Sequence, residues 1–253
     1  MTISTDIQQI IPKPFGLTFY EKTIEKTDEA YNIAKELVEK LFFGMSKLST
    51  KYCNDIFCDL PFLYSERRLD CVLLPTLSKI CNSMVLVELP VNREYSKNQD
   101  PNNQSSGRID YWCIYKEYSF IIELKHSYDC FTTPITRERK ILERWLEMNT
   151  QLKSVKNYAK QCEEKTKGII RLGLHLITSY CDKYPNKELV SCFKESVHIT
   201  FRRLAKDIPS PKPDMVLCWS IPHNIVFSYE RTYPGLWALA KIYPPIHHHG
   251  AIK

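Results

Sequence analysis

Residues 107–126 read GRIDYWCIYKEYSFIIELKH and contain the strongest strand pattern of the chain. Its two halves, 108–115 and 119–126, are rich in aromatic and β-branched residues, which favour β-strands. The residues between them are too few for any connection but a hairpin. The sequence therefore predicts two neighbouring antiparallel strands here.

Three charged residues, Asp110, Glu123 and Lys125, interrupt these otherwise apolar strands. If the hairpin turns about residues 117 and 118, Asp110 lies opposite Lys125 and diagonal to Glu123. Glu123 and Lys125 share one face because side chains alternate along a strand. The pattern predicts two carboxylates and an amine on one patch of sheet, and a slip of one residue would separate them.

Two carboxylates held close together repel each other unless a cation lies between them. Their hard oxygen atoms suit Mg²⁺ or Mn²⁺, and such an ion keeps positions open for water and a substrate phosphate. Lys125 is then placed to orient the attacking water and to balance charge on the phosphate. The structural alternative is that Asp110, Glu123 and Lys125 are exposed strand charges joined by a cross-strand salt bridge.

The rest of the chain supplies elements on both sides of this hairpin. Apolar residues at helical spacing predict helices over 27–43, 66–80, 136–165 and 188–206. Short apolar runs predict strands over 84–91, 169–178 and 215–221. A strand, a long helix and a further strand in succession indicate a crossover, so we expect an α/β (α+β) fold with a mixed β-sheet flanked by helices.

The hairpin with its charged residues resembles the PD-(D/E)XK nuclease superfamily, which has the restriction-endonuclease-like fold. The resemblance covers residues 65–221 and includes the expected order of helix, three antiparallel strands, helix and strand. It implies that Asp110 and Glu123 bind the metal with help from the backbone carbonyl of Leu124, and that Lys125 is the catalytic lysine. Asp110 follows Ile109 where the signature has proline, a departure that many members tolerate.

Many branches of this superfamily carry a further acidic residue on the preceding helix, for which Glu66 is the candidate and Glu88 the alternative. Lys97 lies in the polar stretch 94–107 and Arg108 directly follows it. Both are candidate nucleic-acid contacts. The resemblance thus implies an Mg²⁺-dependent or Mn²⁺-dependent nuclease that acts on DNA, in defence or repair, with RNA not excluded. The alternative is a catalytically inactive module of the same fold that binds nucleic acid or a protein.

Composition limits these readings without choosing among them. The chain has 253 residues, of which 43% are hydrophobic, and 35 basic against 29 acidic residues give a net charge of +6. Its ten cysteines include no Cys-x-x-Cys pair, its N-terminus lacks a secretory pattern, and its apolar runs fall far short of the roughly 20 residues that span a bilayer. We therefore expect a cytoplasmic protein without a membrane partner.

Three regions are expected along the chain. Residues 1–64 form an N-terminal helical region that packs on the core or forms a homodimer, and residues 65–221 form the nuclease-like core. Residues 222–253 form a proline-rich, loop-rich C-terminal extension, because prolines are frequent there.

Overall fold

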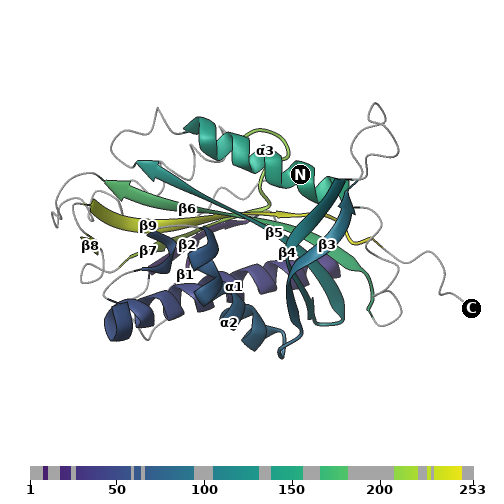
Figure 1. Ribbon diagram of the computed structural model, residues 1–253, viewed down its shortest axis with the longest axis horizontal. Coiled ribbons are helices and arrows are strands. Elements are labelled where there is room, and N and C mark those ends of the chain that lie inside the picture. Colours follow the sequence, from purple (N-terminus) through teal and green to yellow (C-terminus); the bar gives the residue numbers. More distant parts are fainter. Residues whose placement is uncertain are drawn as a thin grey trace, which may run out of the picture.

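The computed structural model describes residues 8–10, 18–23, 27–57, 60–63, 66–93, 105–130, 138–155, 166–181, 208–221, 227–228 and 231–246. They form one nine-stranded sheet with helices on both faces (Figure 1). The strand order is β1-β2-β7-β9-β6-β5-β4-β3, and β8 pairs with β9. β5 and β6 run parallel and the other paired strands run antiparallel, which confirms the predicted mixed sheet and α/β class.

The strands are β1 (Gln8–Ile10), β2 (Thr18–Thr23), β3 (Val85–Arg93), β4 (Ser105–Tyr115), β5 (Tyr118–Cys130), β6 (Ile169–Cys181), β7 (Met215–Ser220), β8 (Phe227–Ser228) and β9 (Arg231–Ile242). The helices are α1 (Glu29–Tyr52), α2 (Asp70–Ile80) and α3 (Glu138–Ser154), with short helical turns at Cys53–Phe57, Pro61–Leu63 and Glu66–Leu69. The predicted helix over 188–206, together with residues 136–137 and 156–165 of the predicted third helix, lies outside the described residues.

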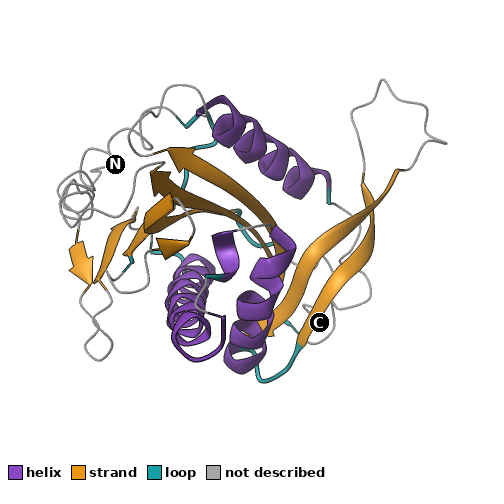
Figure 2. Ribbon diagram, turned by 60° about the vertical axis from the view of Figure 1, so that its left-hand side comes forward, coloured by secondary structure: helices purple, strands orange, loops and turns teal. Residues whose placement is uncertain are grey.

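The helices form two layers, with α1 and α2 on one face of the sheet and α3 on the other (Figure 2). β5 shows why the sheet accepts helices on both faces, since Ile122 and Leu124 pack with α1 and α2 while Ile121 packs with α3. Side chains of Trp145 and Met148 on α3 are fully buried against the second face. Glu123 and Lys125 have the same parity as Ile121 and therefore belong to the α3 face.

α3 connects β5 to β6 and makes their parallel pairing possible, because parallel neighbours need a long crossover. The predicted crossover is thus confirmed. Asp28 caps α1 by accepting a 2.8 Å hydrogen bond from the Ala30 N–H, and α1 continues to Tyr52, beyond the predicted end at 43. α2 continues through Pro75.

The terminal regions contribute more strand than the sequence predicts. β2 pairs with β7 along its whole length, so region 1–64 is not only helical. The expectation of a loop-rich extension over 222–253 is wrong, because β9 lies between β6 and β7 and is almost completely buried. Pro234 is tolerated in β9 because it lies where the pairing with β6 changes register, a position that needs no ladder N–H.

Candidate active site

The β4–β5 hairpin sets the register of the site. Tyr115 pairs with Tyr118 across a two-residue turn, Lys116 and Glu117, whose φ angles of 45° and 66° are those of a tight hairpin turn. The prediction of a turn about 117 and 118 is therefore wrong by one position, which moves the pairing by two residues. The shifted register puts Asp110 nearest to Glu123 instead of Lys125. β4 also turns at this residue, since Tyr111 packs with α1 and α2 whereas Ile109 packs with α3.

The two strands separate where the charged residues begin. The last residue pair that joins β4 to β5 is Tyr111 with Ile122, and beyond it the N–H groups of two alternate β5 residues bind side-chain carboxylates. Leu124 N donates to Asp110 Oδ2 at 2.6 Å, and His126 N donates to Glu66 Oε2 at 3.0 Å. Since neighbouring N–H groups on one edge of a strand are about 7 Å apart, the fold holds these two carboxylates side by side.

Glu123 and Lys125 lie next to this pair and are buried, with 3% and 9% of their surface exposed. Lys125 Nζ lies 3.5 Å from Glu123 Oε1 and 3.6 Å from Glu147 Oε1 on α3. A buried charge is costly unless opposite charges compensate it, so the ammonium and the two carboxylates stabilise one another.

The pKa of Glu66 is raised above its ordinary value by the surroundings of its carboxyl group. Burial of the carboxyl raises this pKa first, the charge of Lys125 lowers it, and the charge of Asp110 raises it. A smaller lowering comes from Arg144, whose Nη1 lies 3.5 Å from Glu66 Oε2. Glu66, Asp110 and Lys125 thus act on one another electrostatically, although 44 residues separate the first two in sequence.

Sequence reasoning missed two members of this cluster, Arg144 and Glu147. They lie one helical turn apart on α3, and Arg144 reaches Glu66 while Glu147 reaches Lys125. The only signal in the sequence is their spacing of three, which puts both on one face of the helix. Several other charged residues of α3 show similar spacing, so the docking of α3 on the sheet is needed to identify this face.

The other candidates lie elsewhere. Arg108 and Glu88 form an exposed ion pair between β4 and β3, so the Glu88 carboxylate is engaged by Arg108. Lys97 lies outside the described residues. Leu124 has its backbone N–H on the side of Asp110, and its carbonyl shares that edge because both groups of a strand residue point to the same neighbour.

The donor set fits a hard divalent cation in chemistry. Asp110, Glu123 and the Leu124 carbonyl offer only oxygen atoms, the ligands that Mg²⁺ and Mn²⁺ prefer. A cation here would also offset the charge of Asp110, which adds to the effect of burial in raising the pKa of Glu66. Across the described ranges, however, no three His, Cys, Asp or Glu side chains are arranged as a ready metal site. Binding would therefore require side-chain adjustment.

The candidate active site thus consists of Asp110, Glu123, Lys125 and Glu66, supported by Arg144 and Glu147. None of the described helices is long and apolar enough to cross a membrane. Comparison with protein-family models, curated proteins and solved structures finds no match to this chain.

Proposed function

We propose that this protein is a metal-dependent nuclease of the restriction-endonuclease-like fold that hydrolyses phosphodiester bonds of DNA. One observation carries the proposal: Asp110, Glu123, Lys125 and Glu66 meet where β4 leaves β5. Charged groups are concentrated at this point within otherwise apolar strands, and a cluster of ionisable groups that includes a carboxyl of raised pKa, here Glu66, is typical of active sites.

In this proposal Asp110, Glu123 and the Leu124 carbonyl hold Mg²⁺ or Mn²⁺, which when bound supplies Lewis-acid activation of water and phosphate. Lys125 orients the attacking water and balances negative charge that develops on the phosphate. Glu66, whose pKa is raised by burial, is suited to exchange a proton with that water. Glu147 and Glu123 hold the Lys125 ammonium between them.

DNA is the proposed substrate because the resemblance implies it and the net charge of +6 favours a polyanion. Arg108 is exposed at the β3–β4 edge and Arg144 is exposed beside Glu66, so both are proposed to contact phosphates. No disulfide joins the seven cysteines that the structure describes, and the proposed location of this activity is cytoplasmic.

The test is cleavage of supercoiled, linear and single-stranded DNA, and of RNA, with Mg²⁺ or Mn²⁺. Wild type is compared with Lys125→Ala and with Lys153→Ala, which removes an exposed lysine of α3 as a matched control. We expect metal-dependent cleavage of DNA that falls at least about a hundredfold in Lys125→Ala and is retained in Lys153→Ala. Circular dichroism and thermal melting verify that each variant is folded.

A binding module without catalysis is the second candidate, and one observation favours it. The Asp110 and Glu66 carboxylates already bind main-chain N–H groups, and no ready three-ligand site exists among the described residues. This candidate predicts nucleic-acid binding that is indifferent to Mg²⁺ and to Asp110→Ala. Absence of cleavage by the folded wild type on every substrate, together with such binding, would replace the nuclease proposal.

A further inference from the structure

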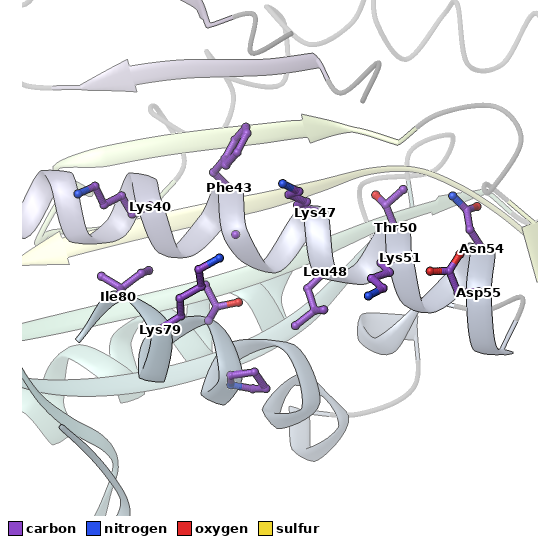
Figure 3. Close-up of a pocket in the computed structure, with 13 residues that line it drawn as sticks. Lys40, Phe43, Lys47, Leu48, Thr50, Lys51, Asn54, Asp55, Lys79 and Ile80 are labelled. Carbon is purple, nitrogen blue, oxygen red and sulfur yellow. The ribbon is translucent and has the colours of Figure 1, made fainter. Parts of the chain in front are cut away.

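A groove of about 920 Å³ runs between α1 and α2, on the face of the sheet opposite α3 (Figure 3). It exists because the two helices come very close at one point. A Cβ on Gly44 would lie 2.5 Å from Thr76 Cγ2, so only glycine permits this approach of α1 to α2. Side chains of both helices line the groove on either side of this contact.

The walls combine apolar side chains with lysines. Phe43, Leu48, Pro75 and Ile80 supply apolar surface, and these side chains are only partly covered. An apolar groove that remains open to water is a recognised feature of interaction surfaces. The groove therefore favours a partner that brings an apolar face of its own.

The charges of the groove are strongly unbalanced. Lys40, Lys47, Lys51 and Lys79 line it together with a single acidic residue, Asp55. Lys40 forms an ion pair with the Glu36 carboxylate at 2.8 Å, and all four lysines are exposed along the groove. In Figure 3 the Lys79 side chain extends from α2 toward α1.

The spacing of these lysines indicates the shape of the partner. Lys40, Lys47 and Lys51 lie seven and four residues apart, so they follow one face of α1 over about 16 Å. Ammonium groups spread along a line match a series of carboxylates better than they match one phosphate. An α-helix with acidic residues every three or four positions offers that series, and its other face offers apolar side chains.

We propose that this groove binds an acidic amphipathic helix of a partner protein, which lies along α1 and α2 as a third helix. Because the groove is basic, the polar face of the partner helix must be acidic, and the apolar walls of the groove supply the contact area. A single-stranded nucleic acid fits less well because Phe43 is the only aromatic side chain among the described residues that line the groove, and sequence-tolerant nucleic-acid grooves depend on repeated base stacking. The proposal does not depend on the nuclease site, which uses the other face.

The test uses a display library of amphipathic peptides of about 16 residues, long enough to span the groove at 1.5 Å per residue. Apolar positions are fixed and the remaining positions carry Glu, Lys or Ser. The library is sorted against the full chain at physiological salt, and an enriched peptide is synthesised for fluorescence anisotropy. The charge-reversed variant Lys47→Glu/Lys51→Glu is compared with Lys140→Glu/Lys153→Glu, which changes the charge equally at exposed positions of α3.

We expect enrichment of Glu-rich helices whose Kd rises at least tenfold in Lys47→Glu/Lys51→Glu and less than twofold in Lys140→Glu/Lys153→Glu. Replacing the apolar residues of the peptide by Ser should abolish binding. The proposal is overturned if no peptide is enriched, if enriched peptides carry no acidic bias, or if both double variants lose the peptide equally. It is also overturned if an oligonucleotide of about 16 nucleotides, and no peptide, depends on Lys47 and Lys51.

Discussion

The Asp110 carboxylate accepts the main-chain N–H of Leu124 at 2.6 Å, beyond the last pair of residues that joins β4 to β5. One carboxylate therefore has two tasks in the proposed enzyme. It accepts a β5 N–H that lies beyond the paired part of β4. Its remaining oxygen lone pairs are proposed to bind the metal. Substitutions at Asp110 can separate these tasks.

Asp110→Asn keeps a carbonyl acceptor for Leu124 N, whereas Asp110→Ala leaves this N–H without its partner. In the presence of EDTA we expect Asp110→Ala to lower the free energy of unfolding by about 1–3 kcal/mol and Asp110→Asn by less than about 1 kcal/mol. Both variants should lose cleavage and Mn²⁺ binding, because neither offers the metal a carboxylate. Urea unfolding, isothermal calorimetry with Mn²⁺ and cleavage assays measure the three quantities.

Full cleavage activity in Asp110→Asn would contradict the proposed metal role of Asp110. Equal destabilisation by Asn and Ala would contradict the structural role, because the amide oxygen then gives no support to Leu124 N. The two results are independent, so each task of the carboxylate is tested separately.

Glu147 is expected to position Lys125, since its carboxylate lies 3.6 Å from Nζ while remaining half exposed. Glu147→Gln should lower kcat by about tenfold and change KM less, because it removes a group that orients the lysine and not the bound nucleic acid. The free energy of unfolding should change by less than about 1 kcal/mol, as for other exposed ion pairs.

Glu143→Gln is the matched control for Glu147→Gln, because it removes the same charge from an exposed position of the same helix. A similar fall in kcat for both variants would show that the effect is a general change in surface charge. If Glu147→Gln changed KM and left kcat unaltered, Glu147 would not be a positioning residue for Lys125.

The elements of the core are predictable because local composition decides them. The aromatic and β-branched residues of β4 and β5 and the single long helix before β6 leave few alternatives to a hairpin followed by a crossover. The register of the β4–β5 turn is harder to predict from the sequence. Its two positive-φ positions are filled by Lys116 and Glu117, where Asn and Gly would have marked them in a sequence.

Long-range packing decides what the sequence fails to predict. β9 contains a proline and lies in a part of the chain where prolines are frequent, yet pairing with β6 and β7 on both edges makes it a central strand. Glu147 and Arg144 belong to the site because α3 docks with that face toward β5, a contact that no local pattern specifies. Glu66 is a predicted candidate, but its bond to His126 N depends on a turn that precedes α2 and approaches β5 in space.

Stability should fall as pH decreases from 7 to 5, because two buried histidines are neutral in the folded state. Burial lowers the pKa of His126 to about 4 and that of His175 to about 3. The unfolded chain takes up these protons near pH 6.5, so the stabilisation is complete above that pH and is lost as the pH falls toward the folded values. Each histidine contributes a slope of up to about 1.4 kcal/mol per pH unit.

His175→Gln tests this dependence because glutamine keeps a polar partner for the Ser127 hydroxyl, which lies 2.8 Å from His175 Nε2. Unfolding by urea in EDTA at pH 7, 6 and 5 should show a shallower loss of stability in the variant. The raised pKa of Glu66 acts with the opposite sign, since its contribution is present below its unfolded value and is lost as pH rises. An unchanged slope in His175→Gln would contradict the assignment of a neutral, buried His175.

Gly173 is expected to set the distance between α3 and the site. It pairs with Glu123 across the parallel strands, and a Cβ at this position would lie 2.7 Å from Met148 Cε and 3.0 Å from Leu152 Cδ1. Gly173→Ala should therefore displace the Met148 and Leu152 side chains and, through them, α3; we expect a free energy of unfolding lower by about 1–3 kcal/mol and a reduced kcat as Glu147 moves away from Lys125.

Met148→Ala should be destabilising alone, since Met148 is fully buried, but it removes the atoms that clash with an alanine at 173. The double variant Gly173→Ala/Met148→Ala should be more stable than the sum of the single effects predicts, by about 0.5–3 kcal/mol. Its kcat should also recover relative to Gly173→Ala. Additive free energies would show that Gly173 does not control the approach of α3 through Met148, and that the position of Glu147 is fixed by other contacts of the helix.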